Sequence, residues 1–96
     1  MNLSERLKKH REKILELAAY HGASNIRIFG SVARQEADAH SDIDFLVELE
    51  PGRSLLDLGS LLTDLQTLLG CPVDIVTEKG LRTRIRDRVL QEAIPL

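Results

Sequence analysis

Two aspartates, Asp42 and Asp44, are the residues of this sequence whose types and spacing most directly suggest chemistry. They open a mostly apolar run that ends at Leu49 and is typical of a β-strand, in which alternate side chains point to the same face. Two carboxylates held side by side repel each other unless a cation or hydrogen-bond donors compensate their charge. The spacing therefore predicts a site for a divalent cation such as Mg²⁺, which takes oxygen ligands and often shares them with substrate phosphates.

A glycine and a serine, Gly30 and Ser31, precede these acids, with ten residues between Ser31 and Asp42. They follow the apolar residues 26–29, which predict a short strand. Glycine permits a sharp turn and the close approach of a ligand, and backbone N–H groups at the start of a helix bind anions. Arg34 could either reach phosphates or anchor the following loop by pairing with an acid. The pattern predicts a phosphate-binding turn beside the carboxylates.

A third acid, Asp74, stands inside the run Cys71 to Val76, which predicts another strand. An ionised group within a short apolar strand is rarely left unpaired. If this strand neighbours the one that begins at Asp42, then Asp74 joins Asp42 and Asp44 in a cluster on one face. The alternative is an acid on an edge strand that faces water.

The combined pattern resembles the signature of the polymerase-beta-type nucleotidyltransferase superfamily. The run from Phe29 to Arg34, together with the run from Ser41 to Val47, is similar to its minimal nucleotidyltransferase (MNT) branch. The resemblance covers nearly the whole chain. It implies the nucleotidyltransferase fold, an α/β (two-layer α+β) domain with a small mixed sheet and helices packed on one side. Family members typically carry glycine where this chain has Gln35.

The resemblance also implies an activity, the transfer of AMP from ATP to a hydroxyl acceptor, supported by two Mg²⁺ ions. It assigns metal binding and catalysis to Asp42, Asp44 and Asp74, with Asp74 helping to activate the acceptor hydroxyl. It assigns nucleotide binding to Gly30, Ser31 and Arg34. Such proteins often act as antitoxins beside a helical HEPN-type RNase toxin, whose tyrosine receives the AMP.

Two other functional classes remain open from the sequence. One is a binding protein of the same fold that neutralises its partner by occlusion, without turnover. The other is a subunit of a drug-modifying or RNA-modifying nucleotidyltransferase. Ninety-six residues leave no room for a separate acceptor-binding domain. The acceptor, and part of the site, are therefore expected from another polypeptide or a second copy of the chain.

Length and composition set the remaining expectations. The chain suits a single domain over residues 1–96, and its net charge of −2 does not favour nucleic-acid binding through bulk charge. Cys71 is the single cysteine, so an internal disulfide is excluded and a small buried side chain is expected. We find neither an apolar run of membrane-spanning length nor a signal-peptide pattern, so a cytoplasmic protein without membrane contact is expected.

Three helices are expected from apolar spacing. One covers residues 3–21 and stops at Gly22. A second begins after Ser54, a predicted N-cap with Asp57 three residues on, and ends at Gly70. Its core stripe is predicted as Leu55, Leu58, Leu62, Leu65 and Leu69. Its apolar arc is widened by Leu56, Leu61 and Leu68, which either face a second protein or are covered by another helix.

The third predicted helix runs from Gly80 to Pro95. Its apolar positions are Leu81, Ile85, Val89 and Ala93. Four arginines occupy its other faces, and Glu78, Asp87 and Glu92 are close enough in sequence to neutralise some of them. A solvated or partner-facing helix is favoured over a nucleic-acid groove, which would also need aromatic stacking residues.

Overall fold

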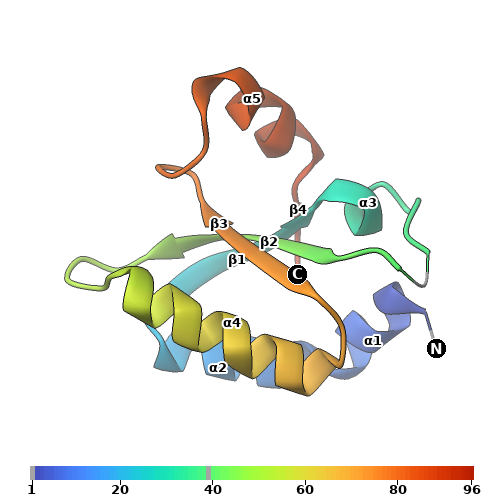
Figure 1. The fold of residues 1–96 in the computed structure, drawn as a ribbon, viewed down its shortest axis with the longest axis horizontal. Helices are drawn as coiled ribbons and strands as arrows, with labels where there is room; N and C mark the ends of the chain where they lie inside the picture. The colour runs from blue at the N-terminus through green and yellow to red at the C-terminus, as the bar shows by residue number, and fades with distance from the viewer. Residues whose placement is uncertain (1, 39) are drawn as a thin grey trace.

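The computed structural model describes residues 2–38 and 40–96 and contains a four-stranded sheet of order β3-β2-β1-β4 (Figure 1). The strands are β1 (Ala23–Phe29), β2 (Ile43–Leu49), β3 (Val73–Thr77) and β4 (Ile94–Pro95). β1 runs antiparallel to β2 and β4, whereas β2 and β3 are parallel. The predicted mixed sheet is therefore confirmed, with β2, the strand that follows Asp42, as one of its two central strands.

Helices lie on both faces of this sheet. α1 (Leu3–Lys9), α2 (Arg11–Tyr20) and α4 (Leu55–Leu69) lie below it in Figure 1, and the short α3 (Gly30–Ala33) follows β1. α5 (Thr83–Glu92) lies on the opposite face, where Leu46, Leu81 and Val89 form a second, smaller core. The resemblance predicted helices on one face of the sheet only, and the position of α5 on the other face was not predicted. Within the described residues no helix is long and apolar enough to cross a membrane.

The predicted single helix over residues 3–21 is wrong in one respect, because the chain bends at His10. His10 has φ −104° and ψ 11°, and it separates α1 from α2. The bend lets Leu3 and Leu7 join the same core as Ile14. Gly22 ends α2 as predicted, with φ +78°, a conformation that glycine adopts without steric cost.

α4 begins and ends at the predicted residues. The Ser54 hydroxyl accepts a hydrogen bond from the start of the helix while Asp57 accepts the Ser54 N–H, and Gly70 ends it with φ +69°. The buried residues of α4 are Leu61, Leu65 and Leu69. Leu55 was predicted in the core but is 82% exposed. It lies six positions before Leu61, about 120° away around the helix, and so points to solvent.

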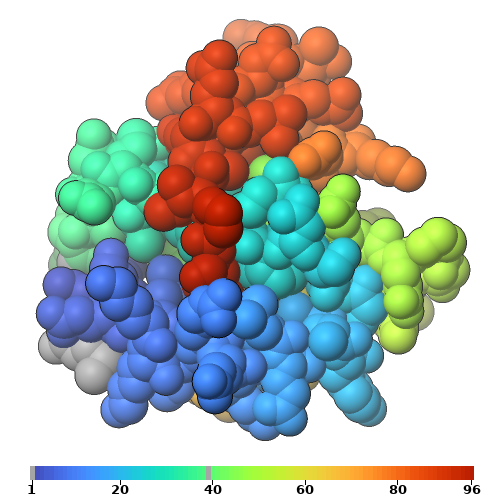
Figure 2. All heavy atoms as spheres, turned by 180° about the vertical axis from the view of Figure 1, so that it is seen from behind, coloured from blue at the N-terminus to red at the C-terminus, as the bar shows by residue number. Residues whose placement is uncertain are grey.

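The C-terminal residues form a strand that the sequence pattern did not predict. After α5, β4 pairs with β1, with Ile94 opposite Ile28, and the Leu96 N–H donates to the Ile26 carbonyl at 3.0 Å. Figure 2 shows this segment, in red, running beside β1, in cyan, onto the N-terminal helices, in blue. The end of α5 is thereby fixed to the sheet. Ile85, one of the predicted apolar positions of this helix, is 46% exposed.

Candidate functional site

The parallel pairing of β2 and β3 brings two of the predicted site residues together. Asp44 and Asp74 are register partners, and paired residues of neighbouring strands point to the same face. They share that face with Leu46, which packs under α5. Asp42 directly precedes β2 and is exposed, as is Asp74. β3 is an edge strand and Asp74 is exposed, as one of the two predictions for this residue had it, and Asp74 also lies beside Asp44.

Asp44 is the more enclosed of these carboxyl groups. Burial raises its pKa from 3.8 to about 6, with further increases from the negative charges of Asp74 and Asp42. Arg34 opposes the increase and Glu92 adds to it. A carboxyl group whose pKa is raised by burial and by neighbouring acids lacks a positively charged partner that would balance its charge. The site therefore favours a cation.

Gly30 lies directly against the Asp44 carboxylate. Phe29, the last residue of β1, is the register partner of Asp44, and Gly30 then opens α3 with φ +74°. A Cβ atom at Gly30 would overlap Asp44 Oδ2. Both the backbone conformation and the space require glycine here. The half-buried Ser31 is therefore held in the first turn of α3, directly after the glycine that contacts Asp44.

The polar groups of this turn are engaged by an acid that the sequence pattern did not indicate. The Gly30 N–H donates to Glu92 Oε1 at 2.8 Å. Arg34 Nη1 donates to both carboxylate oxygens of Glu92, at 3.1 and 3.2 Å, and Arg34 Nε donates to Glu36 at 3.1 Å. In this conformation Arg34 pairs with acids, the second of the two predicted roles.

The sequence suggested that Glu78, Asp87 and Glu92 neutralise some of the α5 arginines, and the charge of Arg88 does help to lower the pKa of Glu92. The carboxylate of Glu92 pairs with Arg34, and that of Glu78 pairs with Arg27 at 2.8 Å. Arg86 instead donates to the Glu78 backbone carbonyl. No local pattern identifies Glu92, because its partner Gly30 lies 62 residues earlier in the chain.

The donor set suits a divalent cation in its chemistry. Within residues 2–38 and 40–96, no group of three His, Cys, Asp or Glu side chains is already arranged to hold a metal ion. Asp42, Asp44 and Asp74 nevertheless provide only oxygen donors, which hard cations prefer. The raised pKa of Asp44 is also the property that a bound cation would reverse. The residues present therefore fit Mg²⁺.

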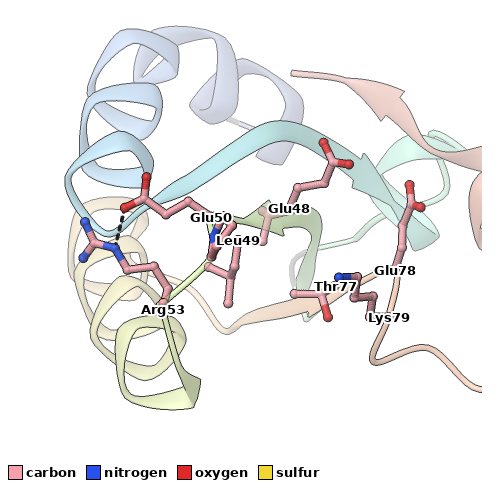
Figure 3. Close-up of a pocket in the computed structure, with 10 residues that line it drawn as sticks. Glu48, Leu49, Glu50, Arg53, Thr77, Glu78 and Lys79 are labelled. Carbon is pink, nitrogen blue, oxygen red and sulfur yellow. Dashed lines mark hydrogen bonds and ion pairs between the residues drawn. The ribbon is translucent and has the colours of Figure 1, made fainter.

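A separate pocket of about 460 Å³ lies at the other end of the same two strands. Figure 3 shows the side chains that surround it, which come from the end of β2 (Glu48), the β2–α4 connection (Arg53) and the segment after β3 (Lys79). Arg53 is already paired with Glu50 at 2.7 Å. Neither Asp44 nor Asp74 lines this pocket. Asp42 and Asp74 are exposed, and Asp44 is half-buried between them and the smaller core.

The sequence matches the family model described as a nucleotidyltransferase domain over residues 7–96. The chain belongs to this family. The nucleotidyltransferase domain is 42% identical over 94 residues to a candidate protein adenylyltransferase of Methanocaldococcus jannaschii, covering 98% of this chain and 97% of that protein. It is 40% identical over 79 residues to the protein adenylyltransferase MntA of Thermococcus cleftensis, covering 82% and 80%.

Solved structures agree with this family and with the fold predicted from the sequence. One, described as a candidate minimal nucleotidyltransferase, superposes with a TM-score of 0.89 at 55% identity, covering 100% of this chain and 97% of that one. Another, a mutant of the toxin–antitoxin MntA–HpeT, gives a TM-score of 0.72 at 25% identity, covering 90% and 70%. The resemblance to minimal nucleotidyltransferases is confirmed.

Proposed function

We propose that this nucleotidyltransferase transfers AMP from ATP to a protein hydroxyl, and that the acceptor is a tyrosine of a HEPN-type RNase toxin. The observation that carries the proposal is the placement of Asp44 and Asp74 in one register, on one face, with Gly30 against the Asp44 carboxylate. The names of the protein adenylyltransferase relatives support the reaction, and the MntA–HpeT structure supports a toxin partner.

The residues of the site divide the work between phosphate binding and proton transfer. Gly30, Ser31 and Arg34 supply hydrogen-bond donors and positive charge for the triphosphate. The acceptor oxygen forms a bond to the α-phosphorus, while the bond from that phosphorus to the bridging oxygen breaks and pyrophosphate leaves. Asp74 is exposed and takes the proton of the acceptor hydroxyl.

Asp42, Asp44 and Asp74 would hold Mg²⁺, with two ions expected from the family resemblance. When bound, Mg²⁺ supplies stabilisation of the charge that develops on the entering and leaving oxygens. The Asp44 carboxyl releases its proton near pH 6. In the metal-free chain it is therefore an anionic ligand at pH 7 and becomes protonated as the pH falls below about 6, and a bound cation would shift this protonation to lower pH.

The openness of the site suits a protein acceptor. Asp42 and Asp74 are exposed, and Asp42, Asp44 and Asp74 do not line the pocket of Figure 3. A small-molecule site commonly buries most of its ligand in a cleft. A tyrosine presented by a second protein can instead reach exposed carboxylates and complete the enclosure of the site.

The test is AMP transfer from radiolabelled ATP to a HEPN-type partner co-expressed with the chain. Wild type is compared with Asp44→Asn and with Glu48→Gln, which removes the same charge from an exposed position on the same strand. We expect a labelled tyrosine with wild type and Glu48→Gln and no label with Asp44→Asn. Toxin neutralisation that survives Asp44→Asn would indicate occlusion without turnover. Label in small hydroxylated molecules or RNA ends, with none in protein, would refute the proposed acceptor.

A further inference from the structure

Glu92, the last residue of α5, lies where the proposed function places a phosphate group. Its carboxylate accepts the Gly30 N–H at 2.8 Å and pairs with Arg34 at 3.1 Å. Both donors belong to the set assigned above to the triphosphate. An anion of the protein itself therefore holds two of the groups that the nucleotide needs.

The position that Glu92 occupies is built for a negative charge. Burial raises the pKa of its carboxyl, yet the hydrogen bond from Gly30 and the pairing with Arg34 outweigh burial and keep the pKa below its ordinary value. The Glu92 side chain is only 19% exposed, compared with 65% for Glu36, the other acid paired with Arg34. A carboxylate and a phosphate oxygen make the same demand on such donors.

We propose that Glu92 is a built-in competitor for the phosphate position, and that ATP binds by displacing the Glu92 carboxylate from Gly30 and Arg34. This inference rests on the proposed function, because it takes the triphosphate as the ligand of those donors. It adds a form of regulation to the site. Any anion that binds at this position must offset the loss of the contacts that Glu92 makes with Gly30 and Arg34, so its apparent affinity is reduced.

The displacement requires a side-chain rotation and no unfolding of α5. Val89, one turn earlier, is buried in the second core, and Ile94 in β4 pairs with Ile28 in β1. The backbone on either side of Glu92 is thus fixed. Because glutamate has three rotatable side-chain bonds, its carboxylate can leave the turn while α5 stays in place. Arg34 then keeps Glu36 as a partner and turns its free N–H groups to phosphate.

The test measures the affinity for a non-hydrolysable ATP analogue with Mg²⁺ by calorimetry. Glu92→Gln keeps the size and a hydrogen-bond acceptor but removes the competing charge, and we expect it to bind about tenfold more tightly than wild type. Glu36→Gln is the matched control, since it removes the other acid paired with Arg34 and leaves Gly30 untouched. Its affinity should stay within about twofold of wild type. Glu92→Ala, which removes the carboxylate entirely, provides a second variant if Glu92→Gln does not fold.

A second readout is the amide resonance of Gly30 in ¹⁵N-labelled protein. Relative to nucleotide-free wild type, we expect this resonance to shift in nucleotide-free Glu92→Gln. We also expect it to shift in wild type when the analogue is added. Weaker or unchanged binding by the Glu92 variants would overturn the inference, because Glu92 would then be a positioning residue or have no role at the site. The inference would also be overturned if the Gly30 amide resonance did not change in the Glu92 variants. If AMP transfer to the partner still occurs, the proposed function survives either result. If no form of the protein binds the analogue or transfers AMP, the proposed function fails first and the inference fails with it.

Discussion

Replacing Asp44 by asparagine should make the metal-free protein more stable at neutral pH. The ordinary pKa of 3.8 rises to about 6 in the folded chain because of burial and the charges of Asp74 and Asp42. A rise of that size corresponds to ~3 kcal/mol for a fully buried group. Asp44 is only partly buried, so solvent screening reduces the expected gain to about 1–2 kcal/mol. For a chain of this length the melting temperature should rise by about 5–10 °C.

The sign of this effect also fixes its pH dependence. Below about pH 4 the carboxyl is protonated in both the folded and the unfolded chain and imposes no penalty. Between about pH 4 and pH 6 the unfolded chain releases the proton first, so the contribution of Asp44 to stability falls as the pH rises. The difference between Asp44→Asn and wild type should therefore be small at pH 4 and reach its full size above pH 6.

The assay is urea denaturation at pH 4, 5, 6 and 7 without divalent metal. Glu48→Gln is the control, because it removes one negative charge from an exposed position on the same strand. It should differ little from wild type at every pH. The reasoning is refuted if Asp44→Asn is no more stable than wild type at pH 7. It is also refuted if Glu48→Gln gives an equal gain, because the effect would then come from net charge alone.

Three further predictions address the turn and the metal. Gly30→Ala should lower the free energy of unfolding by about 2–3 kcal/mol and abolish AMP transfer, because the φ of +74° and the Asp44 carboxylate exclude a Cβ atom at this position. The control is Gly59→Ala in α4, where a Cβ atom meets open space, and it should leave the stability unchanged or raise it by up to ~1 kcal/mol. Equal losses of stability for the two variants in urea denaturation would contradict this prediction. Gln35→Gly should stabilise the fold by about 0.5–1 kcal/mol, since Gln35 has φ +60°; a loss would show that its side chain contributes more than its backbone costs. Millimolar Mg²⁺ should raise the melting temperature of wild type and not of Asp44→Asn, because only the folded site binds the ion; no shift with or without ATP would count against a metal site in the isolated chain.

Local signals in the sequence predict the parts of this fold that depend on neighbouring residues. Ser54, Asp57 and Gly70 fix both ends of α4, because their hydrogen bonds and backbone angles are formed within the helix termini themselves. The alternation around Asp44 likewise predicts which side chains point away from the core. The placement of Asp74 beside Asp44 follows from the same alternation once β2 and β3 are neighbours, since a shift of one residue would turn Asp74 to the opposite face.

Features that depend on distant segments are not visible in the sequence. The bend at His10 and the pairing of β4 with β1 reflect where the helices and the C-terminus meet the sheet. His21 is buried, and its Nε2 lies 2.7 Å from Asp64 Oδ2 in α4, 43 residues later in the chain. These features depend on contacts between segments that are far apart in the chain, and the periodic spacing of apolar residues does not indicate which distant segments meet.

The two faces of β2 explain why the site can be altered without destroying the fold. Ile43 and Phe45, on the face toward α2 and α4, are fully buried and hold the strand in the main core. Asp44 lies between them in sequence but on the opposite face, at the margin of the smaller core under α5. Changes of charge at Asp44 or Glu92 therefore act on electrostatics and ligand binding, while the strand that carries Asp44 keeps its packing. Loss of activity in such variants, with an intact melting transition, reports on chemistry, whereas truncation of Phe45 would remove activity and stability together.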